Sequence, residues 1–246
     1  MPPPAETISK PEFNALLAAY PALPGQKTLQ DLDTYRYEEA PLLFGKKNRE
    51  MTLPDVQKLV EWKLRHGKYR PTLKSLISSN PPALTKQTIS SALALYKTNP
   101  QAQGQAHAHT LNTAREPSGC IQRALDALIK LKGVGPATAS LLLNVHDPER
   151  VVFFSDEAYY WLCCRGKRTV IRYTAREYAE LTRQAGELAR RLDVGMVDVE
   201  KVAYVVVNGG VGSDGVNVAR KETVSKRKTD GPAEETGLRR SKRRRD

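Results

Sequence analysis

An aspartate stands where an apolar run ends and a helix is expected to begin, downstream of two closely spaced glycines. The run is "VVFF" (151–154), the aspartate is Asp156, and the glycines are Gly133 and Gly135 within "LKGVGPATAS". A fixed carboxylate stabilises positive charge that develops on a reacting group, and it can orient or deprotonate a water. A carboxylate at a helix start is also a common cap, so a purely structural role stays open.

The glycine stretch predicts a tight turn between two helices. The apolar spacing on either side places these helices over 121–132 and 136–145. We expect both glycines to use their freedom to adopt a positive φ. Unpaired N–H groups of the turn and of the second helix's first turn, with the positive end of the helix dipole, suit a phosphate. An ordinary αα-hairpin with a glycine cap is the alternative.

The string "LKGVGPATA" resembles the signature L-x-G-[VI]-G-x-x-T-A of the helix–hairpin–helix DNA glycosylase superfamily, which includes endonuclease III and the alkylbase glycosylases. The superfamily's second mark is an aspartate past the hairpin and near a helix start, and Asp156 stands 21 residues after Gly135. The resemblance covers roughly residues 120–207 at the level of motifs. It implies that Asp156 is the catalytic carboxylate that supports hydrolysis of a damaged base's N-glycosidic bond.

The resemblance also implies a DNA interface at the hairpin. The backbone amides of the turn would hold a phosphate, Thr138 would stabilise the first turn of the second helix, and two lysines on the approach would add charge. Such contacts position a protein on double-stranded DNA without reading its sequence. The residues expected in this interface are Lys130, Lys132, Gly133, Val134, Gly135 and Thr138.

One position departs from the superfamily members that also cut the DNA strand. These carry a lysine two residues after the second glycine, where this chain has Ala137. Alanine cannot form a Schiff base with the sugar, so the chain resembles the monofunctional branch, which uses water and leaves an abasic site. The four spaced cysteines of an iron–sulfur loop are missing as well, because no cysteine follows Cys164. We therefore expect neither a cofactor nor a metal.

Aromatic and basic side chains supply further candidates. A glycosylase receives the flipped base in an apolar and aromatic pocket, for which Tyr159, Tyr160 and Trp62 are candidates, although each could be a core residue. Adjacent residues do not share a helix face, so at most one of the two tyrosines is expected to line a pocket. The basic stretches 63–74 and 164–172 could contact phosphates or be solvated helix ends.

The periodicity along the chain predicts an all-α fold, a helix–hairpin–helix glycosylase-like bundle. We expect one helical domain over 28–218, with the polar stretch 98–119 as a linker or insertion. Residues 1–27, rich in Pro and Ala, are expected to be disordered or weakly ordered, with at most one short helix over 12–20. Thr52 with Asp55 predicts one helix start, and Asp198 predicts the cap of the last helix.

The net charge of +12 indicates a polyanionic partner, most simply double-stranded DNA. Half of it lies in the last 27 residues, and we expect 219–246 to be a disordered tail. Two basic clusters there resemble a bipartite nuclear-import signal, with a nonspecific DNA-binding arm as the alternative. They consist of Lys226, Arg227, Lys228, Arg239, Arg240, Lys242, Arg243, Arg244 and Arg245.

These patterns predict a nuclear, monomeric protein of base-excision repair with nuclear-import receptors as partners. No apolar run is long enough to span a membrane and no secretory signal opens the sequence, so no membrane partner is expected. Two other functions stay open, a noncatalytic DNA-binding protein and a chromatin-complex subunit. The choice of base and the choice between DNA and RNA also stay open.

Overall fold

The computed structural model describes residues 3–20, 29–98 and 118–209, and within these ranges the chain is helical with no strand. The expectation of an all-α protein is therefore confirmed for this part. Two π-helical segments, η3 and η4, accompany ten α-helices. In order they are α1 (Lys10–Ala19), α2 (Gln30–Thr34), η3 (Tyr35–Glu39), η4 (Leu42–Lys46), α3 (Leu53–His66), α4 (Leu73–Ser78), α5 (Pro82–Lys97), α6 (Ser118–Leu128), α7 (Pro136–Asn144), α8 (Asp156–Cys163), α9 (Ala175–Leu192) and α10 (Met196–Asn208).

Some expectations concern residues outside the described ranges. The basic tail with its nuclear-import signal, expected over 219–246, lies outside them entirely. So do residues 99–117 of the polar stretch that was expected to be a linker or insertion.

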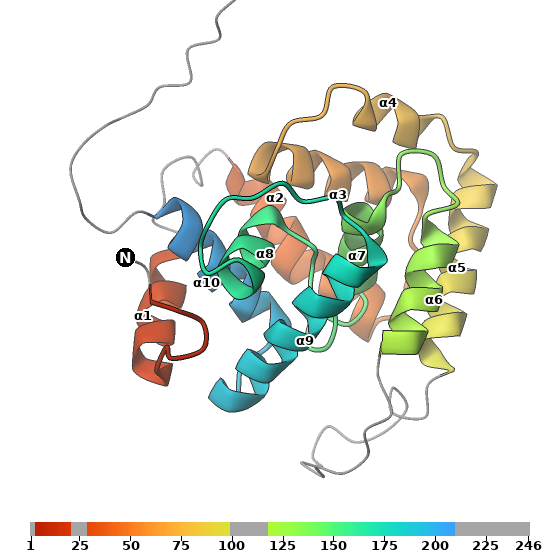
Figure 1. Ribbon diagram of the computed structural model, residues 1–246. Helices are drawn as coiled ribbons and strands as arrows, with labels where there is room; N and C mark the ends of the chain where they lie inside the picture. The colour runs from red at the N-terminus through yellow and green to blue at the C-terminus, as the bar shows by residue number, and fades with distance from the viewer. Residues whose placement is uncertain (1–2, 21–28, 99–117, 210–246) are drawn as a thin grey trace, which may run out of the picture. The chain divides into compact units, whose positions relative to one another are not determined.

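Helix α7 lies at the centre of the core. Every residue from 137 to 144 is buried, as is typical of a short helix with apolar residues on all sides. Helix α3 packs against α7, and α6 joins it through the glycine turn. Figure 1 shows α6 running beside α5, the pair with the most extensive packing in the fold.

Helix α3 begins as the sequence predicts. The backbone N–H of Thr52 donates to Oδ2 of Asp55 over 2.8 Å, which satisfies the amide at the helix start. Gly67 is the C-cap. One face of α3 is fully buried, including Leu59 and Trp62, and the helix therefore carries its remaining side chains toward the surface or toward a pocket.

Residues 3–20 are more ordered than the expected weakly ordered N-terminus, although α1 lies where the sequence allows one short helix. They form α1 and the turn before it, with Ile8 and Phe13 buried against the core. Arg191 of α9 donates to the carbonyl of Ile8 over 2.7 Å, and α1 packs beside α10 (Figure 1). The Pro- and Ala-rich composition does not indicate that Ile8 and Phe13 are buried. Their burial offsets the conformational entropy lost when the segment becomes ordered.

The last helix also begins earlier than expected. Gly195, not Asp198, is the N-cap of α10, and the N–H of Asp198 donates to the carbonyl of Gly195 over 3.1 Å. Asp198 instead lies in the first turn, where a negative charge interacts favourably with the helix dipole. Among the described helices, none combines the length and the apolar character needed to cross a membrane.

Candidate functional site

The two glycines of the turn between α6 and α7 have different conformations. Gly133 has φ +77, and a Cβ there would lie 2.9 Å from the Cβ of Leu76, so the turn packs directly on α4. Gly135 has φ −97 and ψ −179, an extended conformation open to other residues, and serves as the N-cap of α7. The expectation of a positive φ is therefore confirmed at Gly133 and wrong at Gly135.

Asn80, which the sequence did not single out, clamps the turn. Its side-chain oxygen accepts from the N–H of Lys132 and its amide nitrogen donates to the carbonyl of Lys132, both over 2.9 Å. The same amide nitrogen donates to the carbonyl of Ile77 over 3.0 Å, so the end of α4 and the turn are joined. This buried double hydrogen bond fixes the backbone between the two helices.

The turn presents two unpaired amides, not three. The N–H of Val134 donates to the carbonyl of Leu131 over 3.1 Å, and its side chain is buried, so Val134 has no amide to offer. The N–H groups of Gly133 and Gly135 have no partner within the described part of the chain. A Cβ added at Gly135 would have no heavy atom of a neighbouring residue within 4 Å, apart from its chain neighbours. Lys132 is exposed beside them.

The other predicted interface residues divide between surface and core. Lys130 is exposed, whereas Thr138 is buried at 2% exposure. The N–H of Thr138 donates to the carbonyl of Gly135 over 2.9 Å, which is part of the first turn of α7. Thr138 therefore belongs to the packing of the helix start, as expected of a residue that stabilises it.

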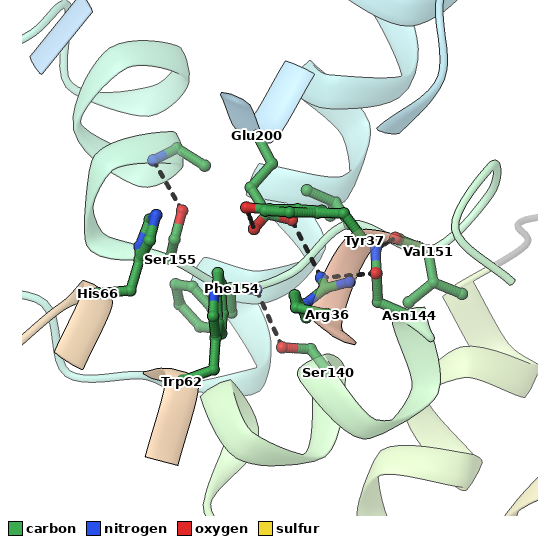
Figure 2. Close-up of polar contacts among 12 residues, drawn as sticks. Arg36, Tyr37, Trp62, His66, Ser140, Asn144, Val151, Phe154, Ser155 and Glu200 are labelled. Atoms are coloured by element: carbon green, nitrogen blue, oxygen red, sulfur yellow. Dashed lines mark hydrogen bonds and ion pairs between the residues drawn. The ribbon is translucent and has the colours of Figure 1, made fainter. Parts of the chain in front are cut away.

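Side chains of α7 fasten the segment that leads to Asp156. Oγ of Ser140 accepts from the N–H of Phe154 over 2.9 Å, and Nδ2 of Asn144 donates to the carbonyl of Val151 (Figure 2). From α9, the hydroxyl of Tyr178 donates to the carbonyl of Val152 over 3.0 Å. The extended run 151–154 is thus buried and hydrogen-bonded without belonging to a sheet.

Asp156 is the first residue of α8, and it is partly exposed. Ser155 is the N-cap, since its Oγ accepts from the N–H of Ala158 over 3.1 Å. Ser155, and not Asp156, therefore caps α8, so the capping role considered for Asp156 is wrong. The carboxylate of Asp156 is free to bind other groups. The hydroxyl of Tyr173 donates to Oδ1 of Asp156.

A small pocket that is partly open to solvent lies beside Asp156. It brings together the start of α8, the end of α3 and α7, because Ala137 lines it as well. Ala137 occupies the position where strand-cutting glycosylases carry a lysine. The lining residues are Trp62, Lys63, His66, Gly67, Lys68, Arg70, Ala137, Phe153, Phe154, Ser155, Asp156, Glu157 and Tyr173.

Aromatic groups form much of the pocket wall. Trp62 is fully buried, its ring stacks on His66 with centroids 4.6 Å apart, and its Nε1 donates to Asp33 over 2.7 Å. Trp62 is thus both a core residue and a pocket residue, whereas neither Tyr159 nor Tyr160 lines the pocket. The tyrosine at the pocket comes from the loop before α9, and no pattern near Asp156 could have indicated it.

The side chains of the basic stretch at the end of α3 differ in their exposure to solvent. Lys68 and Arg70 are exposed at the pocket rim, and the guanidinium of Arg70 lies 5.5 Å from the ring centroid of Tyr173. Lys63 and His66 are instead only partly exposed and line the pocket. Burial lowers the pKa of His66 to about 3, and the ring is neutral at physiological pH.

An ion pair that sequence reasoning missed lies beneath Trp62. Arg36 of η3 is fully buried, and its guanidinium donates to Asn144 over 2.7 Å and to Glu200 over 3.2 Å (Figure 2). Its Cζ lies 5.2 Å from the ring centroid of Trp62. The pair therefore connects η3, α7 and α10 under the pocket. Only the tertiary structure brings these residues together, since Asn144 and Glu200 lie 108 and 164 positions after Arg36.

Glu157 gives the pocket a second acidic group beside Asp156. Burial raises the pKa of the Glu157 carboxyl, and the neighbouring charge of Asp156 raises it further. Glu157 therefore holds a proton more readily than an ordinary glutamate, which favours a single negative charge at this end of the pocket.

No protein-family model, curated protein or solved structure matches this chain. The resemblance to the helix–hairpin–helix glycosylases therefore depends only on the residues of the glycine turn and on Asp156.

Proposed function

We propose that this protein is a monofunctional DNA glycosylase of the helix–hairpin–helix type, which hydrolyses the N-glycosidic bond of a damaged base. The observation that carries the proposal is that Asp156 and Ala137 line one pocket. Ala137, at the start of the helix that follows the glycine turn, and the carboxylate of Asp156 therefore line the same pocket. A phosphate held at the turn would bring the neighbouring nucleoside to the carboxylate.

The turn supports binding to a sugar–phosphate backbone. The amides of Gly133 and Gly135 are unpaired, the N-terminus of α7 adds a positive dipole end, and the side of Gly135 is open. Exposed Lys130 and Lys132 add charge next to it. This interface would position the duplex without selecting its sequence.

The pocket supports base excision in three respects. Tyr173, which lines the pocket and is partly exposed, offers an aromatic ring to an extruded base, and the almost fully buried Trp62 and Phe154 form the wall behind it. The carboxylate of Asp156 would stabilise the positive charge that grows on the sugar as the bond to the base breaks, and it would orient the attacking water. The bond from Tyr173 would hold that carboxylate in one position.

A panel of duplexes tests the proposal. Each duplex carries one uracil, alkylated, oxidised or deaminated base, and strand breaks are scored after heat and alkali. We expect wild-type protein to generate labile sites on at least one duplex, and Asp156→Asn to lose them while keeping its fold and DNA affinity. Asp126→Asn is the matched control, because Asp126 is exposed on α6 and, within the described residues, bonds only to Gln122. Labile sites on no duplex would contradict the proposal.

A noncatalytic DNA-binding protein is the second candidate. It is favoured by the hydrogen bond from Tyr173, which already fills an acceptor position of Asp156. This protein would bind duplexes with a steep salt dependence, unchanged in Asp156→Asn, and would cleave none of the panel. A chromatin-complex subunit would instead bind DNA weakly once residues 220–246 are deleted.

We also propose a nuclear location, on the basis of the two basic clusters of the tail alone. Full-length protein fused to a fluorescent reporter should accumulate in nuclei. Replacing Lys226, Arg227 and Lys228 with alanine should reduce that accumulation strongly, since a bipartite signal needs both clusters. Unchanged nuclear accumulation would leave the tail as a DNA-binding arm.

A further inference from the structure

A chain of hydrogen bonds leads from the buried carboxylate of Glu200 to the candidate pocket. The hydroxyl of Tyr37 donates to Oε1 of Glu200 over 3.0 Å (Figure 2), and the hydroxyl oxygens of Tyr37 and Tyr20 are 3.2 Å apart. At the far end, the Tyr20 hydroxyl lies 3.1 Å from Nε2 of His66, whose imidazole lines the pocket. The base excision proposed above assigns no role to this chain.

The hydrogen bonds of the chain have one direction, because it ends on a carboxylate. Burial raises the pKa of Glu200, but a neutral Glu200 would leave the buried guanidinium of Arg36 uncompensated, so we assign the ionised form, which only accepts hydrogen bonds. Burial also raises the pKa of Tyr20 and of Tyr37, so each keeps its single proton. Tyr37 spends that proton on Glu200, and Tyr20 therefore donates to Tyr37. The remaining contact requires Nε2 of His66 to donate to Tyr20.

His66 thus offers the pocket a hydrogen-bond acceptor. Burial and the charge of Arg36 lower the pKa of the imidazole to about 3, so the ring is neutral and carries one proton. That proton is on Nε2, which leaves a lone pair on Nδ1. Within the described residues Nδ1 has no hydrogen-bond partner. Aromatic contacts hold the ring in place, with its centroid 4.6 Å from that of Trp62 and 4.2 Å from that of Tyr204.

Lys63 places a hydrogen-bond donor beside this acceptor. It stands three residues before His66 on α3, so the two side chains share one face of the helix, and both line the pocket. Burial and the charge of Arg70 lower the pKa of the Lys63 amine to about 8, against the effect of Asp156, and about nine-tenths of such amines are still charged at pH 7. The ammonium group makes no hydrogen bond and no ion pair to the described residues.

A donor next to an acceptor is complementary to a lactam edge, in which a ring N–H stands beside a carbonyl group. We propose that the pocket selects bases with this edge, with Lys63 donating to the carbonyl oxygen and Nδ1 of His66 accepting from the N–H. Uracil and hypoxanthine, the products of deamination, present it. The inference rests on the proposed function for the delivery of a base to the pocket.

The same pair of groups disfavours two other classes of base. Cytosine and adenine, from which uracil and hypoxanthine arise, exchange donor and acceptor at these positions, so in the same orientation each would meet two like partners. Alkylated bases with a positive charge are repelled, because Lys63 is in the pocket and Lys68 and Arg70 are at its rim. These three cations outnumber the carboxylate of Asp156.

Binding of methylated uracils tests the inference on the full-length protein without any base excision. 1-Methyluracil keeps the lactam edge and carries a methyl group where the sugar would be attached, whereas 1,3-dimethyluracil has a methyl group in place of the N–H. In nitrogen-15 spectra of the free protein we expect the proton of His66 on Nε2. Millimolar 1-methyluracil should shift the Nδ1 resonance of His66, and 1,3-dimethyluracil should leave it in place.

Substitutions assign the two hydrogen bonds. His66→Phe keeps an aromatic ring but removes the acceptor, and Lys63→Met removes the donor, so each should weaken the binding of 1-methyluracil about tenfold. Lys58→Met is the matched control and should bind as wild type does, because Lys58 is exposed on α3 and lies 3.9 Å from the carboxylate of Glu39. Tyr20→Phe should give a mixture of both His66 tautomers in the nitrogen-15 spectrum, a change that a loss of packing alone would not produce.

Wild-type protein with the His66 proton on Nδ1, or with equal affinity for the two uracils, would overturn the inference whether or not the variants fold. Base excision is measured separately on the lesion panel. Excision of alkylated bases, but not of uracil or hypoxanthine, would overturn the lactam selectivity and leave the glycosylase function. Binding of 1-methyluracil at His66 with no excision on any duplex would keep the lactam site and remove the glycosylase function.

Discussion

The hydroxyl group of Tyr173 donates a hydrogen bond to Oδ1 of Asp156, across 17 positions of sequence. Tyr173 has φ +56, a conformation that costs free energy for a bulky side chain. The capping box of α9, in which the N–H of Thr174 donates to Glu177 over 2.8 Å, holds the backbone beside it. Burial and the charge of Asp156 raise the pKa of the Tyr173 phenol, so it stays a donor at neutral pH. The geometry indicates that Tyr173 positions the carboxylate.

Tyr173→Phe should therefore lower kcat for base excision about tenfold and leave KM for the duplex unchanged, as one hydrogen bond to a charged group contributes about 1.5 kcal/mol. Steady-state kinetics on the best duplex of the lesion panel checks this. Tyr159→Phe is the control, because Tyr159 packs on Phe154 outside the pocket. Equal kinetics of the two variants would mean that Tyr173 has no positioning role.

The two glycines of the turn should respond differently to alanine. Gly133→Ala should lower the free energy of unfolding by about 2 kcal/mol or more, because φ is positive and the new Cβ would meet Leu76 at 2.9 Å. Gly135→Ala fits its extended backbone and open surroundings, so its stability should be within about 0.5 kcal/mol of wild type. Denaturant titrations measure both.

The same Gly135→Ala protein tests the phosphate site. A methyl group beside the unpaired amide keeps a phosphate at a distance, so duplex affinity should fall several-fold although the fold is intact. Fluorescence anisotropy at two salt concentrations measures the change. Affinity equal to that of wild type would place the DNA backbone elsewhere on the protein. Gly186→Ala on α9 is a control remote from the turn, with only Met196 near its new Cβ, at 3.9 Å.

Arg36 and Glu200 should stabilise the fold only as a pair. Arg36→Met leaves the Glu200 carboxylate buried without its cation and should cost about 3–5 kcal/mol in unfolding free energy. Burial already raises the pKa of Glu200, so the lone carboxyl would take up a proton. The double variant Arg36→Met with Glu200→Met should recover part of the loss, and a double-mutant cycle by denaturant unfolding measures the coupling. Additive losses would show that the two residues act independently.

Acid should destabilise the protein through His66. Its pKa is about 3 in the folded protein, against about 6.5 in an unfolded chain, so only the unfolded chain gains a proton between these values. The stabilisation is complete above pH 6.5 and decreases as the pH falls toward 3. Melting temperatures between pH 7.5 and 5 should therefore fall less steeply in His66→Phe, which keeps the ring contacts to Trp62 and Tyr204. Parallel curves would contradict this origin of the acid sensitivity.

Local patterns in the sequence determine several of the helices and some of their ends. The apolar spacing predicts α6 and α7, Thr52 with Asp55 predicts the start of α3, and Gly133 predicts the left-handed residue of the turn. These features depend on interactions within about one helical turn, which neighbouring residues specify. The placement of Asp156 at the start of α8 follows in the same way from the apolar run before it.

Only the tertiary structure decided what surrounds Asp156. Tyr173 and Lys63 come from a loop and from α3, and neither has a local pattern that distinguishes it from other tyrosines and lysines. Likewise, the burial of residues 3–20 depends on a surface formed by α9 and α10. The physical reason is that burial and the proximity of charges depend on packing between distant segments. These long-range contacts set which groups meet, how far their pKa values shift, and what chemistry the pocket can support.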